Sequence, residues 1–179
     1  VEAGLVVDDH VQKVKIKYRG DGRYHWAYYK KSKRIKTKKK EVFEGMRSFN
    51  LLIPKLPAQI VNYLSYELTS MMGFIAPKVE LVNLAINGKY EGIHLLMEQL
   101  DESTLRRLNR MPGDLYKGEW INQETYKGVD SFVFVHSGLW EKIAINNHYT
   151  NESYKPLERL FERIHGSDNE ESHRALMEM

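Results

Sequence analysis

The residues best suited to chemistry in this 179-residue sequence are the lysines and arginines near its N-terminus. Residues 13 to 40 contain 13 Lys and Arg side chains and one acid, Asp21, which gives this stretch a charge of +12. The rest of the chain carries 14 basic and 23 acidic residues. Such segregation attracts phosphates, whether in a nucleotide, a nucleic acid or an anionic surface. The alternative is that these lysines are the solvated outer faces of strands.

Two strands are expected to position these cations. Over residues 13 to 19, apolar residues alternate with Lys and Arg, the period of two of a strand with one buried face. A second strand is predicted over residues 32 to 38, where Ile35 is the only large apolar side chain. Alternation places Arg34 and Lys36 on the side opposite Ile35, so both face away from a core onto which Ile35 packs. It does not decide which of the two would contact a ligand.

A helix is expected to bring an acid to the protein. Residues 58 to 72 predict a helix that starts after Pro57 and ends before Gly73. At about 100° per residue, Glu67 falls inside its apolar stripe. A carboxylate on the buried face needs a cationic or hydrogen-bonding partner, because burying it alone costs several kcal/mol. Alternatively, Glu67 lies at the edge of the stripe and its head reaches solvent. The stripe consists of Ile60, Leu64, Leu68 and Met71.

A β-hairpin is predicted over residues 77 to 98. Its turn is Asn87-Gly88, a pair that favours the positive φ angles of a two-residue hairpin turn. Because both strands carry large apolar residues on both faces, we expect this hairpin in the middle of the domain. Helical spacing follows near residues 105 to 108 and again at 157 to 164.

These elements predict an α+β fold. A mostly antiparallel sheet of about five strands would pack against the one main helix. We expect residues 1 to 100 to form this sheet and helix as one lobe. Residues 101 to 179 would be the beginning of a second, more helical region.

Several classes of site lack their motifs. The sequence has no Cys, no P-loop, no Gly-x-Gly-x-x-Gly fingerprint, no His-Glu-x-x-His pair and no Gly-x-Ser-x-Gly elbow. No apolar run approaches the roughly 20 residues that cross a bilayer. We therefore expect no membrane span and assign no catalytic or metal-ligating residue. Asp101, Asp114 and Asp130 remain as alternatives for metal ligands within the chain.

A nucleic-acid-binding domain is an alternative use of the basic segment. Tyr24, Trp26, Tyr28 and Tyr29 lie among its cations, and stacking plus phosphate contact is how proteins bind single strands. We favour the interpretation that these aromatic side chains cover the sheet. Nucleic-acid binding would weaken steeply with salt, whereas a nucleotide site would saturate with ATP over other anions.

The order of the elements points to phosphoryl transfer. In the N-terminal lobe of protein kinases, a strand Lys orients the nucleotide phosphates and a helix Glu holds that Lys. Here too a basic strand precedes a helix with an inward Glu and then a hairpin. The carboxylate would aim the cation and keep it protonated.

Several sequence blocks, in this order and spacing over about residues 11 to 120, resemble the spore-coat-protein-H (CotH) family of atypical protein kinases. The blocks are Arg19-Gly20, Lys31-Ser32-Lys33-Arg34-Ile35-Lys36, Leu51-Leu52, Tyr63-Leu64-Ser65-Tyr66-Glu67-Leu68, Gly73-Phe74-Ile75-Ala76-Pro77, Asn87-Gly88-Lys89-Tyr90-Glu91-Gly92, Glu98-Gln99 and Leu115-Tyr116-Lys117-Gly118. The resemblance implies a kinase-like fold that uses ATP and Mg or Mn to phosphorylate proteins rich in serine.

The resemblance also implies roles for single residues. Lys36, with Arg34 beside it, would approach the ATP phosphates, and Glu67 would orient that cation. Glu98 and Gln99 would border the adenine. In the last block, Lys117 would line the same cleft.

The resemblance places the catalytic and metal-binding aspartates in an Asp-rich stretch beyond the helical tail. Because the sequence stops at Met179, we expect a portion of such a kinase that folds and binds nucleotide but does not catalyse transfer by itself. An extracytoplasmic or spore setting is expected from the family. A non-catalytic binding or structural module with a kinase-like shell is the remaining alternative.

Overall fold

The computed structural model describes residues 1–20, 29–38, 40–54, 59–118, 137–143, 154–165 and 174. The chain forms two compact units, Val1–Met111 and Pro112–Met179, which are described separately. No helix in the described ranges is both long and apolar enough to span a membrane.

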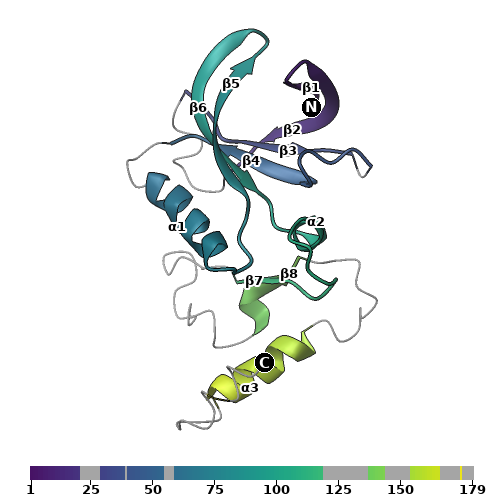
Figure 1. Cartoon of the computed structure of the whole chain (residues 1–179), viewed down its shortest axis with the longest axis vertical. Helices are drawn as coiled ribbons and strands as arrows, with labels where there is room; N and C mark the ends of the chain where they lie inside the picture. The colour runs from purple at the N-terminus through teal and green to yellow at the C-terminus, as the bar shows by residue number, and fades with distance from the viewer. Residues whose placement is uncertain are drawn as a thin grey trace. The chain divides into compact units, whose positions relative to one another are not determined.

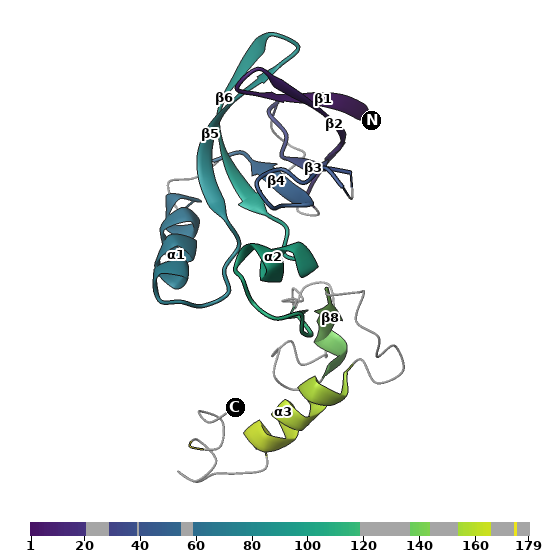
Figure 2. The same cartoon turned by 45° about the vertical axis from the view of Figure 1, so that its right-hand side comes forward.

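The first unit is built on an antiparallel sheet of six strands that curls on itself (Figures 1 and 2). The strands are β1 (Glu2–Val7), β2 (His10–Tyr18), β3 (Lys33–Lys36), β4 (Ser48–Leu52), β5 (Val79–Ile86) and β6 (Lys89–Glu98). They lie in the order β1-β2-β3-β4-β6-β5. The predicted α+β fold with a mostly antiparallel sheet is confirmed. Strand β1 is absent from the prediction. Its sequence, with Gly4 before three consecutive apolar residues, lacks the clear alternation that marks a strand.

The hairpin of β5 and β6 confirms the predicted turn. Asn87 and Gly88 have φ angles of 50° and 78°, the left-handed conformation that this turn requires. Its place in the sheet corrects the prediction, because β6 is interior while β5 forms an edge. Leu81 and Ile93 are accordingly 48% and 54% exposed. Apolar residues on both faces of a strand therefore do not ensure that it is central.

The core lies on one face of the curled sheet, and it positions the cations of β3. Ile35 is 3% exposed, which confirms that it packs inward. Lys33 and Thr37, on the same side as Ile35, are also buried, whereas Lys36 on the opposite side is exposed. The predicted alternation along this strand is therefore confirmed. The buried cluster around Ile35 consists of Val14, Met46, Phe49, Leu51 and Leu96.

Helix α1 (Gln59–Met71) lies beside β5 and ends as predicted. Gly73 has a φ of 81°, and the N–H groups of Gly73 and Phe74 donate to Ser70 and Thr69 carbonyls, a Schellman ending. The prediction that the apolar stripe faces the protein is wrong. Its members Ile60, Leu64, Leu68 and Met71 are 55%, 57%, 58% and 83% exposed.

The less exposed side of α1 carries Tyr63, Tyr66 and Glu67 instead. Glu67 lies where this side meets the apolar stripe, and Tyr66 lies farther round the helix from the stripe. Periodicity identifies an apolar face, but it does not identify the surface that a helix contacts.

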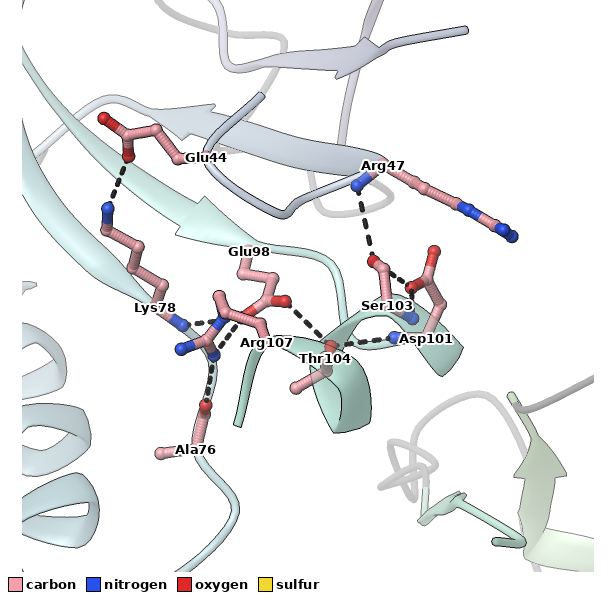
Figure 3. A network of polar contacts seen from close by, with 9 residues as sticks. All are labelled: Glu44, Arg47, Ala76, Lys78, Glu98, Asp101, Ser103, Thr104 and Arg107. Carbon is pink, nitrogen blue, oxygen red and sulfur yellow. Dashed lines mark hydrogen bonds and ion pairs between the residues drawn. The ribbon is translucent and has the colours of Figure 1, made fainter. Parts of the chain in front are cut away.

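The end of β6 is joined to helix α2 (Glu102–Arg107) by a buried carboxylate (Figure 3). Glu98 accepts hydrogen bonds from the Lys78 backbone N–H at 2.9 Å and from Thr104 Oγ1 at 2.8 Å. Its Oε2 also lies 2.6 Å from Arg107 Nη2. Asp101 caps the helix and shares a reciprocal capping box with Thr104. These bonds fix the segment that leaves the sheet.

The second unit contains a two-stranded sheet of β7 (Tyr116–Gly118) and β8 (Trp140–Lys142), the 3-10 helix η2 (Ser137–Leu139) and helix α3 (Lys155–His165). Trp140 packs against Phe161 of α3 with ring centroids 6.1 Å apart. Helical structure near residues 157 to 164 is therefore confirmed, as is the short helix near 105 to 108.

Candidate functional site

Arg34 lies on β3 with its guanidinium held by two neutral side chains. Its Nε donates to Asn50 Oδ1 at 3.1 Å, and its Nη2 donates to Gln99 Oε1 at 2.9 Å. Asn50, on β4, is fully buried, and its Nδ2 lies 3.4 Å from both the Met97 carbonyl and Gln99 Oε1. Three segments of the sheet therefore fix the direction of one cation. Two of the residues predicted for the site, Arg34 and Gln99, are in direct contact.

The amides orient Arg34 without neutralising it. Lys33, Arg47 and Arg107 each pair with a carboxylate, at 2.9, 3.2 and 2.6 Å. Among the described residues, Arg34 has no carboxylate partner, and its Nη1 forms no hydrogen bond. The side chain is also partly exposed. A cation that is fixed, accessible and uncompensated is well suited to bind a phosphate, which matches the planar donors of guanidinium.

The neighbouring Lys33 has the opposite surroundings. It is 6% exposed, and its Nζ bonds Glu91 on β6 at 2.9 Å. The hydrogen bond from Lys33 lowers the pKa of Glu91, against the opposing effect of partial burial. The charge of Lys33 on the core face is thus balanced by the carboxylate of Glu91.

His94 is a second polar side chain on the core face. It is fully buried, and its Nδ1 lies 3.0 Å from the Gly92 carbonyl, to which it donates. Within the described structure its Nε2 has no hydrogen-bond partner. Burial lowers the pKa of His94, and Lys33 contributes in the same direction. The ring is therefore held neutral at physiological pH.

The remaining predicted site residues are Lys36, Glu67, Glu98 and Lys117, and each has its own surroundings. Lys36 is exposed on β3, two residues from Arg34, and its side chain forms no hydrogen bond or ion pair within the described ranges. Glu67 is half-buried on α1, and no described cation pairs with it. The Glu98 side chain is occupied by the network of Figure 3. Lys117 lies on β7 and belongs to the second unit.

The aspartates considered as metal ligands have structural partners. Asp101 caps α2, and Asp114 lies 2.6 Å from Lys142 Nζ. Asp114 also accepts a hydrogen bond from Tyr116, and burial together with this carboxylate raises the pKa of Tyr116 to about 12. The described part of the chain contains no group of three His, Asp or Glu side chains that could hold a metal ion. Asp130 lies outside it.

A family model described as CotH kinase protein matches residues 16–179. The chain belongs to the CotH family. It is also 31% identical over 117 residues to Inner spore coat protein H of Bacillus subtilis (strain 168), a match that covers 65% of this chain and 32% of the relative. The chain thus spans about a third of the length of that curated relative. The family resemblance seen in the sequence blocks is confirmed.

In this CotH chain, sequence reasoning missed Asn50 and the pair of Lys33 with Glu91. A signal for Lys33 was present, since it lies two residues before Ile35 and therefore shares its buried face. A buried lysine demands an acid nearby. No such signal marks Asn50, because its role depends on the alignment of β4 with β3, which places Asn50 opposite Arg34.

Proposed function

We propose that this chain forms the nucleotide-binding lobe of a CotH-type protein kinase and that Arg34 binds a phosphate of ATP. The observation that carries the proposal is the uncompensated guanidinium of Arg34, held at 3.1 and 2.9 Å by Asn50 and Gln99. Phosphoryl transfer relies on positioning and charge stabilisation, so a cation with fixed direction is the part such a lobe must supply.

The fold supports this proposal through the order of its elements. Basic strands, then α1, then the β5–β6 hairpin follow one another as the kinase resemblance implies. Gln99 directly follows β6, and Glu98 acts indirectly by fixing that segment. Glu67 as orienting carboxylate is a further part of the proposal, and so is the role in nucleotide binding that the family resemblance implies for Lys117.

The proposed reaction transfers the γ-phosphoryl group of ATP to the hydroxyl of a serine in a protein acceptor. The divalent ion, Mg²⁺ or Mn²⁺, would neutralise charge on the transferred group. We assign it no ligand among the described residues. Because the curated relative is an inner spore coat protein, we propose a serine-rich coat or exported protein as the acceptor and a spore-coat or extracytoplasmic location.

Thermal unfolding with and without Mg-ATP tests nucleotide binding, since a ligand that binds the folded state raises its apparent stability. We expect saturable stabilisation of the wild-type chain. Arg34→Gln should weaken Mg-ATP binding about tenfold or more, because a charge-assisted contact is lost. Lys15→Gln is the matched control, with the same charge change on the same face of the neighbouring strand β2.

Equal stabilisation of all three proteins would remove Arg34 from the site. No stabilisation of the wild type by ATP with Mg²⁺ or Mn²⁺ would reject the nucleotide-binding lobe itself. Glu67→Gln is a further arm, and an unchanged response to Mg-ATP would remove Glu67 from the site.

A further inference from the structure

The outer face of β2 and β3 carries cations directly opposite one another. The antiparallel register pairs Lys15 with Lys36 and Lys17 with Arg34. Lys13 extends the same row, because alternate residues of a strand share a face. Like charges at directly opposite positions destabilise a sheet. We refer to Lys13, Lys15, Lys17, Arg34 and Lys36 as the cation ladder.

The surroundings of the cation ladder leave its charge largely uncompensated. The side chains of its four lysines are exposed and form no hydrogen bond or ion pair with any described residue. The positions opposite Arg34 and Lys36 on β4 are the neutral residues Asn50 and Ser48. On β1, Glu2 lies opposite Lys15 and is the one acid in register with the ladder among the described strands.

We propose that the lysines of the cation ladder bind an extended, phosphorylated segment of the acceptor protein, while Arg34 keeps the role in ATP binding proposed above. This inference rests on the proposed kinase function and adds a substrate class to it. Each phosphoserine carries a charge of about −1.5 to −2 and three acceptor oxygens. Alternate residues of a strand are about 6.6 Å apart, and an extended peptide repeats the same distance. Phosphoserines at every second position would therefore match the spacing of Lys13, Lys15 and Lys17.

The composition of this face favours a phosphopeptide over a single-stranded nucleic acid. Single-strand binders stack bases on aromatic side chains within the basic groove. The described positions in register with the ladder on β1, β3 and β4 hold Glu, Gly, Arg, Lys, Asn and Ser. The exposed Tyr18 follows Lys17 and therefore points to the other face. Among the described positions in register with it, the ladder provides sites for phosphates and no aromatic platform for bases.

Fluorescence anisotropy of a labelled peptide tests the ladder. The probe is an extended peptide with phosphoserine at every second position, compared with the same peptide carrying serine. We expect the 179-residue chain to bind the phosphopeptide. The triple variant Lys13→Ser, Lys15→Ser, Lys17→Ser should weaken binding about tenfold or more, because three charge-assisted contacts are removed.

The matched control removes three exposed lysines elsewhere, Lys40→Ser, Lys89→Ser and Lys155→Ser, and should change binding less than about threefold. An equal loss in the control would show a general charge effect and overturn the ladder. Tighter binding of an oligothymidylate than of the phosphopeptide would overturn the choice of partner, and equal binding of the serine peptide would overturn phosphate recognition.

Mg-ATP stabilisation of the triple variant separates this inference from the proposed function. We expect the triple variant to keep its response to Mg-ATP, which also shows that it is folded, while phosphopeptide binding is lost. If the wild type fails to respond to Mg-ATP but the phosphopeptide results hold, the nucleotide site is rejected and the ladder stands. If Mg-ATP binds and the triple variant still binds the phosphopeptide, the ladder is rejected alone.

Discussion

Lys33 and Arg34 are consecutive cations on opposite faces of one strand, and they are held in opposite ways. Lys33 enters the core face and is neutralised by Glu91 at 2.9 Å. Arg34 lies on the outer face, held by the amides of Asn50 and Gln99, and keeps its charge. A carboxylate partner makes a cation part of the structure, whereas amide partners leave it available to a ligand.

Removing Glu91 should have the largest effect on stability, because it leaves Lys33 charged and unpaired in the core. Glu91→Ala should lower the free energy of unfolding by about 2–3 kcal/mol, less than for a fully buried pair, since the Glu91 side chain is 23% exposed. Urea unfolding measures this loss. Glu80→Ala, an exposed position on β5, is the control and should change stability by less than about 0.5 kcal/mol. Equal losses would contradict a structural role for the pair.

Gln99→Glu gives Arg34 a carboxylate partner, the kind of partner that Lys33 has in Glu91. The new carboxylate can still accept from Arg34 Nη2 and Asn50 Nδ2, so the fold should be unchanged or slightly more stable. Mg-ATP affinity should fall about tenfold, because the phosphate now competes with a fixed carboxylate. Calorimetric titration measures the affinity. An unchanged affinity would show that preserving the charge of Arg34 is irrelevant.

His94 should make stability depend on pH. Its pKa is lowered in the folded state from a usual value of 6.5, so the unfolded chain binds the proton more readily in weak acid. Stability is therefore full above about pH 7 and decreases as the pH falls below 6.5. Lys33, Glu91 and Lys30 are the charged groups that act on the ring. Urea unfolding on both sides of pH 6.5 should show a weaker dependence in His94→Leu. If the stability of His94→Leu depends on pH as strongly as that of the wild type, groups other than His94 cause the dependence.

The smallest expected effect is a gain of stability on the outer face. Lys15→Thr removes the like-charge pair with Lys36 and adds a residue that favours strands. The free energy of unfolding should rise by about 0.2–1 kcal/mol in low salt, and the gain should shrink as salt screens the repulsion. Lys40→Thr, outside the cation ladder, serves as control. A loss of stability would show that Lys15 contributes to the fold itself.

The strands and the hairpin could be predicted because their signals are local. Alternation around Ile35 and the Asn87-Gly88 turn depend on neighbouring residues alone. The orientation of α1 could not be predicted, since its apolar stripe at Ile60 and Leu64 does not determine which surface the helix contacts. The site was predictable only in part. Arg34 follows from alternation, but the Asn50 contact depends on the register between strands that are distant in sequence.

Nuclear magnetic resonance of the Arg34 side chain can show whether this guanidinium contacts the nucleotide. The Nε–H signal of Arg34 in isotope-labelled protein can be assigned from its loss in Arg34→Gln. During a titration with Mg-ATP, we expect this signal to shift and to saturate together with binding, and sulfate at the same concentration not to reproduce the shift. An Arg34 signal that stays in place while Mg-ATP saturates the protein would show that Arg34 does not contact the nucleotide.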